Sequence, residues 1–420
     1  MNIYYLVVLL FLLFSSKANF LVDYNSAWFG LEVFMIIVAF KLKKVKKRDV
    51  QLFLTSLVVY FLYIAIRFKL NKLPADYFTS DVFYFFKFVF TAYLFCVILR
   101  EKALYYIVKV ISHLAFVSLV FYSLQMFQNG AIVKAIGTTF ESLTVDDQSF
   151  RYTNFIFFTF DDIHYYRNSG FCWEPGAFGS FLTLALMFNF FINDFKLNKE
   201  ALIITLAILT TVSTTAYLGV FLLFFLRYRV LNKGSKITIV MFALIFALAI
   251  PNVPFLGEKI VEIYEQDIQD LKELEQLSVY YEDVERQIPL NRFASVIFLY
   301  EQFNWKLFLG VSNQYDEFYI DEYNVNISNG IMDFLTKFGV VGLFVLLYRY
   351  GKLCKTYLRK MEYVCYSILI LLILSFGEPI LMLPICVIFM FLPTFKNKDF
   401  SALSFEYRVK YLQSQRPHTI

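Results

Sequence analysis

The chain has 420 residues, of which 59% are hydrophobic and 20% aromatic. Ordinary soluble domains are about 45 to 50% apolar, so this composition excludes a soluble globular protein. The net charge of +5 does not indicate a nucleic-acid partner, because the basic residues lie beside apolar segments and not along one polar face.

Apolar segments of about 15 to 20 residues recur along the chain between charged turns, as expected for helices that cross a hydrocarbon core about 30 Å thick. The sequence therefore predicts an all-α polytopic membrane protein, in which residues 1–420 form one membrane domain of about twelve spans. The spans are expected at 3–16, 26–40, 51–66, 82–99, 103–126, 174–192, 201–212, 214–227, 236–251, 331–348, 362–376 and 380–394.

The basic cluster from Lys41 to Arg48 follows an apolar segment and sets the orientation, because lysine and arginine collect on the cytoplasmic side. With this cluster inside, both termini are cytoplasmic, including the tail at 395–420. The first apolar segment has no basic stretch before it, so a retained helix is expected instead of a signal peptide. Within 201–226, two helices that reverse near Ser213 satisfy the charge rule better than one long helix, because both flanks are basic.

Two segments on the outer side are much longer than the other turns, at 128–173 and 252–329. Neither has the composition of a linker. In the second, apolar residues recur at helical spacing from Ile260 to Ile288 among many acidic residues, which predicts an amphipathic helix.

One polar motif joins the first long segment to the sixth span and reads Arg167-Asn168-Ser169-Gly170-Phe171-Cys172-Trp173-Glu174-Pro175-Gly176. Glu174-Pro175 is a good helix start, because a carboxylate suits the positive helix terminus and proline suits the first turn. Arg167 lies only a few residues earlier, in a loop whose Gly170 permits a tight turn. That proximity favours a site for an anionic, lipid-carried substrate, although the residues alone leave both interpretations open.

Asp161, Asp162 and His164 come just before this motif. Two carboxylates and an imidazole can bind a divalent metal, but the chain has only three histidines, and no metal is expected. A solvated loop and a general base are the other two interpretations. The sequence contains no phosphate-binding loop, dinucleotide fingerprint or Cys/His metal spacing, so no cofactor is expected either.

Several cations lie on the outer side, against the positive-inside trend. Arg67, Lys69 and Lys72 flank the end of the third span, and Lys87 lies in the outer part of the fourth. Such side chains can reach the interface by snorkelling. They can also form a cationic seat for a lipid diphosphate, since charges near hydrocarbon are otherwise costly.

Further candidates share that side of the membrane. Arg292 and Ser328-Asn329-Gly330 lie in the second long segment, before the tenth span. Glu378-Pro379 repeats the Glu-Pro helix start in the last outer turn, where a helix cap is expected.

The order and membrane side of these motifs resemble those of the Wzy-type O-antigen and oligosaccharide repeat-unit polymerases. The similar segments are 167–176, Ser213-Thr214-Thr215-Ala216-Tyr217, Arg292 to Gly310, Ser328-Asn329-Gly330 and 337–343. Related O-antigen ligases often have arginine after the serine of the first turn and histidine before the asparagine of the second region. This sequence has Thr214 and Ser328 there, which favours a polymerase.

The resemblance implies a metal-independent glycosyltransferase of the GT-C type in the bacterial inner membrane. It would transfer a growing glycan from undecaprenyl diphosphate to a hydroxyl of the next lipid-linked repeat unit at the outer face. The expected partners are this donor and acceptor, membrane lipid and a chain-length regulator. The alternatives are an O-antigen ligase and, from another class, a lipid-linked oligosaccharide flippase or transporter, which tends to place ionisable residues at the midplane between repeats.

Guanidinium groups remain charged and donate two parallel hydrogen bonds to phosphate, so Arg167 and Arg292 are expected to bind the departing diphosphate. Glu174 is the best placed carboxylate to accept the proton of the attacking hydroxyl. These three are the expected catalytic residues. The expected substrate-binding residues are Gly170, Thr214, Thr215, Tyr217, Asn329, Lys87 and His164.

Overall fold

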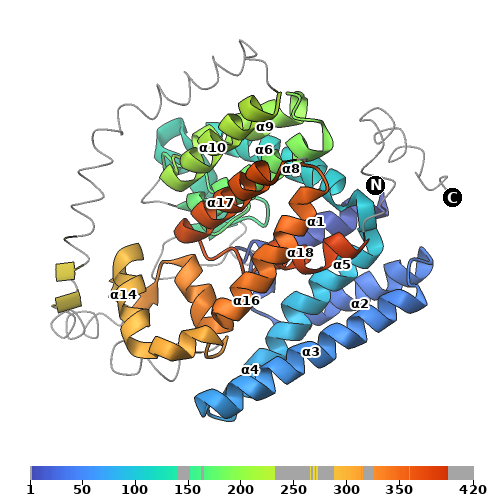
Figure 1. The fold of residues 1–420 in the computed structure, drawn as a ribbon. Coiled ribbons are helices and arrows are strands. Elements are labelled where there is room, and N and C mark those ends of the chain that lie inside the picture. Colours follow the sequence, from blue (N-terminus) through green and yellow to red (C-terminus); the bar gives the residue numbers. More distant parts are fainter. Residues whose placement is uncertain are drawn as a thin grey trace.

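The computed structural model describes residues 2–139, 152–161, 165–231, 265, 268–269, 271–272, 288–313, 315, 325–358 and 360–395, and these residues are mostly helical (Figure 1). The helices of the first half are α1 (Ile3–Ser15), η1 (Phe20–Val22), α2 (Asn25–Lys41), α3 (Lys47–Asn71), α4 (Asp76–Tyr84), η2 (Phe85–Phe90), α5 (Thr91–Leu99), η3 (Arg100–Lys102), α6 (Ala103–Gln125), η4 (Phe127–Gly130), α7 (Ala131–Thr139) and α8 (Pro175–Ile192). Those that follow are α9 (Lys199–Thr210), α10 (Thr214–Leu231), α14 (Arg292–Phe303), η7 (Asn304–Phe308), α16 (Gly330–Lys355), α17 (Met361–Gly377) and α18 (Pro384–Phe395).

Two short sheets belong to the long loops. Strands β1 (Tyr152–Asn154) and β2 (Thr159–Asp161) pair antiparallel, with Thr153 opposite Phe160. Strands β3 (Ile288–Leu290) and β4 (Val325–Ile327) pair in parallel. The second pair brings the residues just before α14 and α16 side by side, although they are far apart in sequence.

A helix lies within each predicted span that the structure describes, and the predicted span at 236–251 lies outside the described residues. Within the described part of the chain, five helical stretches are long and apolar enough to cross a membrane. They are Lys47–Asn71, Tyr77–Gln125, Pro175–Ile192, Thr214–Leu231 and Gly330–Lys355. The chain is therefore a mostly helical membrane protein.

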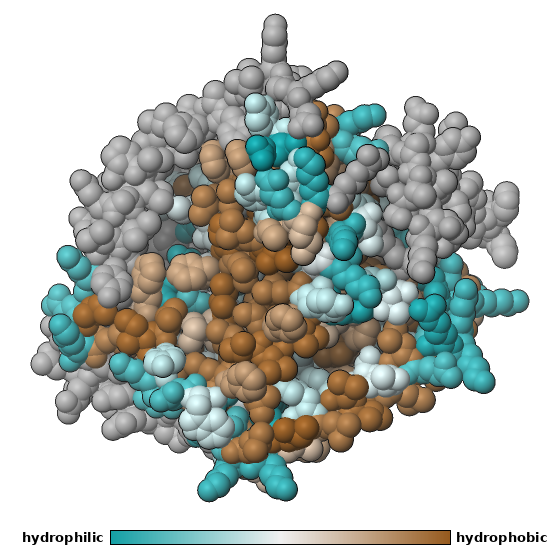
Figure 2. Space-filling model, viewed as in Figure 1, coloured by the Kyte–Doolittle hydropathy of each residue, from teal (hydrophilic) through white to brown (hydrophobic). Residues whose placement is uncertain are grey.

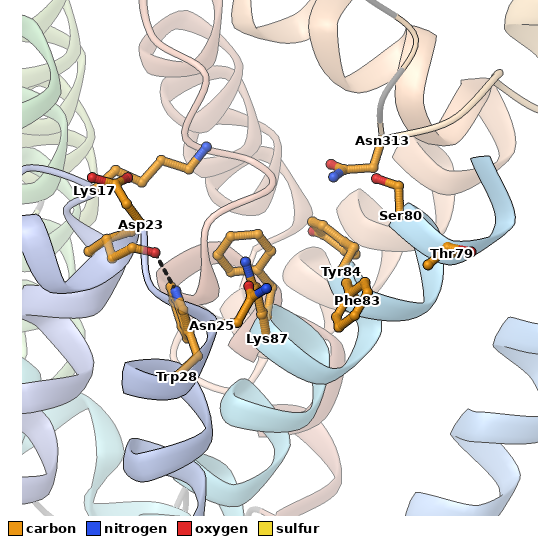
Figure 3. A pocket seen from close by; sticks show the side chains of 12 residues that line it. Lys17, Asp23, Asn25, Trp28, Thr79, Ser80, Phe83, Tyr84, Lys87 and Asn313 are labelled. Atoms are coloured by element: carbon orange, nitrogen blue, oxygen red, sulfur yellow. Dashed lines mark hydrogen bonds between the residues drawn. The ribbon is translucent and has the colours of Figure 1, made fainter. Parts of the chain in front are cut away.

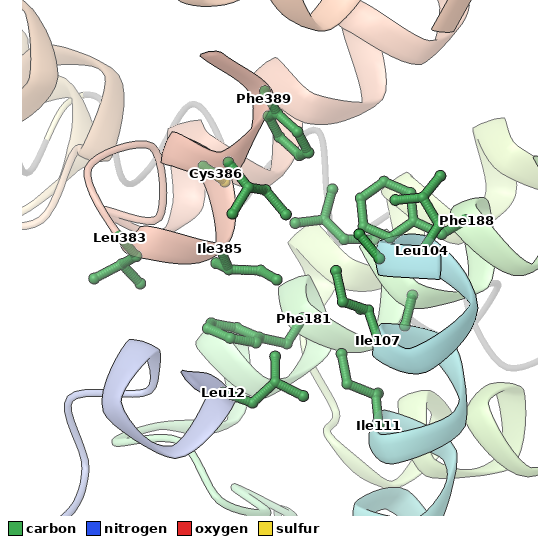
Figure 4. Close-up of a cluster of buried hydrophobic side chains, with 14 of the residues drawn as sticks. Leu12, Leu104, Ile107, Ile111, Phe181, Phe188, Leu383, Ile385, Cys386 and Phe389 are labelled. Carbon is green, nitrogen blue, oxygen red and sulfur yellow. The ribbon is translucent and has the colours of Figure 1, made fainter. Parts of the chain in front are cut away.

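Helix α8 lies at the centre of the helical bundle. All of its residues from Pro175 to Phe191 are buried, and it packs against α6, α9 and α10. A helix that is apolar on every side is an interior helix. Figure 4 shows Phe181 and Phe188 of α8 among side chains of α1, α6 and α18 in the main core.

Helix α3 lies at the edge of the bundle and is the opposite case (Figure 1). Its outward side chains are large, apolar and exposed: Leu54, Val58, Val59, Leu62, Ile66 and Leu70. Apolar side chains also cover much of the middle and lower part of the face in Figure 2. Exposed apolar surface of this extent indicates contact with lipid.

Helix α16 is broken at Gly339, whereas the sequence predicted an uninterrupted span there. Gly339 has φ 68° and ψ 177°, and a Cβ on it would clash with the backbone of Leu309 and Gly310. Gly310 has φ 76°, and a Cβ there would lie 2.6 Å from the Gly339 nitrogen. The break therefore arises from a close backbone contact between two glycines, which no local pattern encodes.

Side chains of α3 bond carbonyl groups on both sides of this close backbone contact. The Tyr63 hydroxyl donates to the Phe338 carbonyl (2.8 Å), Arg67 Nη1 to the Lys337 carbonyl (2.7 Å) and Asn71 Nδ2 to the Gly310 carbonyl (2.7 Å). These three residues recur every fourth position and so share one face of α3. Irregular backbone inside a membrane protein requires such partners.

Arg67 also forms an ion pair with Asp81, and both side chains are fully buried. Neither sequence interpretation of Arg67, as a snorkelling side chain or as part of a diphosphate seat, is therefore correct. Its charge is neutralised within the protein, because a buried guanidinium without a partner would be strongly unfavourable.

Candidate functional site

The turn that follows α17 is where the separate sequence motifs meet. A Cβ on Gly176 would clash with Oε1 of Glu378, and a Cβ on Gly330 would clash with the Glu378 carbonyl oxygen. A Cβ on Gly377 would lie 2.6 Å from Oγ1 of Thr215. Glycine is required at these three positions because other parts of the site occupy the space. The first turns of α8, α10 and α16 therefore converge on the end of α17.

Glu174 occupies the N-cap position of α8, as expected, but its side chain does not cap the helix. Its Oε1 accepts a hydrogen bond from Trp173 Nε1 (2.7 Å). The exposed Glu174 carboxyl group also raises the pKa of the Glu378 carboxyl group, through its charge and through hydrogen bonding. The side chain is therefore directed to the site and not to the free amides of its own helix.

Arg167 is held over the break between α9 and α10. Its Nε donates to the Thr211 carbonyl (3.2 Å), and its own carbonyl accepts from Gln125 Nε2 (2.8 Å). The adjacent Asn168 amide donates to the Thr210 carbonyl (3.0 Å). The predicted break near Ser213 is confirmed, and its free carbonyl groups fix the backbone and side chain of the arginine motif.

Arg292 is the first residue of α14 and its side chain is exposed. Its Nη2 donates to the Gly377 carbonyl (3.3 Å), and its own carbonyl accepts from Asn329 Nδ2 (3.2 Å). The parallel pairing of β3 with β4 holds the two segments in this register. Arg292 thus reaches the same turn that Gly176 and Gly330 contact.

The charges of these segments act on one carboxyl group. The Glu378 side chain is 3% exposed, and burial raises its pKa well above the usual glutamate value. The nearby Glu174 carboxyl group raises the pKa further, whereas Arg292 and Arg167 lower it. Both arginines, which come from separate long loops, therefore lie within electrostatic reach of Glu378.

Glu378 is the site residue that the sequence analysis undervalued. It was expected to cap a helix that begins at residue 380, but α18 begins at Pro384. The intervening residues form a buried turn, in which the Ile380 amide donates to the Glu378 carbonyl (2.7 Å). The recurrence of Glu-Pro was the signal that could have identified it, since both of these glutamates belong to the site.

The other expected substrate-binding residues differ in their exposure and in their contacts within the protein. Thr214 is exposed and Thr215 is half-buried beside Gly377. The Tyr217 hydroxyl donates to the Leu209 carbonyl (2.7 Å), and it stabilises the α9–α10 break.

Two of the expected residues have clear structural tasks. Gly170 has φ 50° and packs against the Phe178 ring, so it forms a buried turn. The buried Asn329 side chain caps α16 by accepting from the amides of Ile331 and Met332. His164 and Asp162 lie outside the described residues.

Lys87 lies in a different place, in a polar pocket of about 920 Å³. It comes from η2, a π-helical segment, which is a rare geometry that often occurs at functional sites. The pocket is also lined by Lys17, Asp23, Asn25 and Trp28 (Figure 3).

The pocket adjoins the turn that contains Glu378. Tyr84 forms part of the pocket wall, and its hydroxyl donates to the Met382 carbonyl (2.8 Å). Met382 lies in the buried turn between α17 and α18. The pocket and the glutamate site are therefore neighbours with separate lining residues.

Among the residues that the structure describes, no group of three or more His, Cys, Asp or Glu side chains is arranged to hold a metal ion. Comparison with protein-family models, with curated proteins and with solved structures finds no match to this chain. The geometry of the site and the resemblance of its motifs are therefore the basis for the functional inference.

Proposed function

We propose that this chain is a glycosyltransferase that polymerises undecaprenyl-diphosphate-linked oligosaccharide repeat units into O-antigen or a related surface polysaccharide. One observation carries the proposal: Arg167 and Arg292, from separate loops, act on the same buried carboxyl group, with Glu174 beside it. Cations that bind a diphosphate and a carboxylate that accepts a proton are the groups that this transfer needs.

The proposed architecture is of the GT-C type, with about twelve spans in the bacterial inner membrane and both termini cytoplasmic. The arrangement of the helix ends supports an anionic substrate. The N-termini of α8, α10, α14 and α16 all contribute residues to the site, and a helix N-terminus carries partial positive charge. The two arginines add to that positive potential.

The proposed reaction is a substitution at the anomeric carbon of the donor glycan. The hydroxyl oxygen of the acceptor sugar forms the new bond to this carbon, and its proton passes to the Glu174 carboxylate. The bond from the anomeric carbon to the diphosphate oxygen breaks, and undecaprenyl diphosphate leaves with the electron pair. Arg167 and Arg292 stabilise the departing charge, since a guanidinium can donate to several oxygens at once.

The pocket around Lys87 suits a second charged portion of substrate. Its volume of about 920 Å³ lies within the range of about 300 to 1,000 Å³ that is usual for small-molecule sites. It presents two lysines together with the asparagine and carboxylate groups that can bind sugar hydroxyls. In this proposal it receives the polar head of the acceptor lipid while the donor diphosphate binds the arginines.

The test uses a strain that lacks its own polymerase, with membrane insertion of each variant verified. Arg167→Ala, Arg292→Ala and Glu174→Gln should each lower polymer formation about a hundredfold or more and leave single-repeat glycans. The matched controls are Arg229→Ala and Glu362→Gln, because these two residues form an exposed ion pair at the opposite end of α17. Both controls should give normal polymer ladders.

The strain assay separates a polymerase from a ligase, and an assay of the purified protein separates both from a transporter. A ligase variant would leave long polymer on its lipid carrier, whereas a polymerase variant leaves one repeat. A transporter would form no polymer when purified and supplied with lipid-linked repeat units. Normal ladders from all three site variants would reject the proposed function.

A further inference from the structure

We propose that Glu378 and Glu174 form a carboxyl pair in which Glu378 keeps a proton and donates it in a hydrogen bond to the Glu174 carboxylate. Glu378 is then a positioning residue that orients Glu174 toward the attacking hydroxyl. The role in catalysis rests on the proposed function, whereas the shared hydrogen bond is a property of the folded protein and can be tested without substrate.

The first argument is proximity. The Glu378 carboxyl group fills the space of the missing side chain of Gly176, two residues after Glu174, and hydrogen bonding with the Glu174 side chain is among the causes that raise the pKa of Glu378. Two carboxylates this close cannot both be ionised without strong repulsion. One proton between them removes the repulsion and supplies the hydrogen atom for a bond.

The surroundings of each group decide which one holds the proton. Glu378 is 3% exposed, whereas Glu174 is exposed and accepts a hydrogen bond from Trp173 Nε1. Within the part of the chain that the structure describes, the buried Oε2 of Glu378 has no hydrogen-bond partner, which is costly for a carboxylate but tolerable for a neutral acid. The proton therefore belongs to Glu378.

The charged and titratable groups around Glu378 agree with this assignment. They are Glu174 at the start of α8, Arg167 in the preceding loop, Arg292 at the start of α14 and the buried thiol of Cys172. From α16, the uncharged Gly330 packs against the Glu378 backbone, and from α10 the uncharged Thr215 packs against the preceding residue, Gly377. Burial raises the pKa of Glu378 more than the two arginines lower it. Burial also raises the pKa of the Cys172 thiol, which therefore stays neutral.

Substrate binding strengthens the arrangement. A diphosphate bound to Arg167 and Arg292 would screen the two cations that lower the Glu378 pKa. Glu378 then keeps its own proton throughout the reaction. The proton from the attacking hydroxyl goes to Glu174, and it leaves to solvent through the exposed side of that residue.

Infrared spectroscopy tests the proton directly. At neutral pH, the difference spectrum between purified wild-type protein and Glu378→Gln should contain a protonated-carboxylic-acid C=O stretch. The matched control Glu362→Gln changes the second residue of the same helix and should keep the band. Identical spectra of the wild type and Glu378→Gln in this region would overturn the proposal whether or not the protein is a polymerase.

The rate profile tests the role in positioning. Glu378→Gln keeps a donor toward Glu174, so its polymerisation rate should stay within about tenfold of wild type, whereas Glu378→Ala should fall about a hundredfold or more.

The wild-type rate should decline at alkaline pH as Glu378 loses its proton, and Glu378→Gln should lack this decline. Two results would refute the role: an alkaline decline in the Glu378→Gln rate that matches the wild type, or an equal loss of polymerisation rate in folded Glu378→Gln and folded Glu378→Ala.

Discussion

At the scale of single residues, the site depends on space as much as on charge. Gly176, Gly330 and Gly377 belong to three separate segments, and each is the position where another part of the site fills the room of a side chain. The first of them accommodates the Glu378 carboxyl group. Substitution of one of these glycines by alanine should therefore displace the group that now occupies the space of its side chain.

Gly176→Ala should displace the Glu378 carboxyl group from Glu174. We expect polymer formation to fall at least about tenfold, and overpacking to destabilise the protein by about 1 to 3 kcal/mol. Gly30→Ala is the matched control, because a Cβ at that helical glycine meets no atom within 4 Å. Ladder analysis and thermal unfolding in detergent measure the two effects. Full activity of Gly176→Ala would show that the carboxyl position is not critical.

The raised pKa of Glu378 predicts how stability depends on pH. The folded state binds this proton more tightly than the unfolded state, so the contribution is fully present below the unfolded glutamate pKa of about 4.3. It is lost as pH rises from there toward the folded pKa. Denaturant unfolding at several pH values should therefore show a downward slope that Glu378→Gln reduces. The same slope in both proteins would contradict the assignment.

At the scale of elements, the connection between α3 and α16 is the main device that holds an irregular backbone inside the bundle. At the break at Gly339, Tyr63 and Arg67 of α3 donate to the Phe338 and Lys337 carbonyl groups, and Asn71 donates to the carbonyl of Gly310, which packs against the break. Asp81 of α4 then neutralises Arg67. Since α16 begins with the site residues Asn329 and Gly330, this connection also fixes the site.

Arg67→Ala should destabilise the protein by about 3 to 5 kcal/mol, because it leaves the Asp81 charge buried without its cation. Thermal unfolding of the purified variant in detergent is the measurement. The double variant Arg67→Ala, Asp81→Ala should be more stable than Arg67→Ala alone, since both buried charges are gone. A double variant that is less stable than the single one would indicate that the ion pair is not the source of the loss.

The elements themselves were largely predictable, because apolar length and charged turns fix where membrane helices begin and end. The break at Gly339 was not, since Phe338-Gly339-Val340 looks like part of one apolar run and the cause is the contact with Gly310. The start of α18 was also misplaced. Its turn is buried and apolar, so it carries none of the polar signals that usually mark a loop.

At the scale of the whole molecule, the sequence predicted that distant motifs would share one end of the bundle, and the arginines and Glu174 do meet there. The identity of their common neighbour, Glu378, could not be predicted in the same way. Its importance comes from burial between three helix starts, and burial of a polar residue in a turn has no sequence pattern. The roles of all four residues remain predictions.

Membrane sidedness is a prediction for the intact molecule. In a Cys365→Ser background, Tyr166→Cys and Tyr300→Cys should both react with a membrane-impermeant maleimide added outside, because both positions are exposed and lie near the arginines in sequence. Met361→Cys, at the exposed start of α17, should react only after permeabilisation. Labelling of Tyr166→Cys and Tyr300→Cys from opposite sides would exclude a common site.

The position of Glu378 late in the chain has a consequence for biosynthesis. Ribosomes deliver the two arginines and Glu174 to the membrane first, and the acid that completes their surroundings emerges only with α17. Under the proposed function, a truncated polypeptide that stops before this helix lacks Glu378 and should form no polymer.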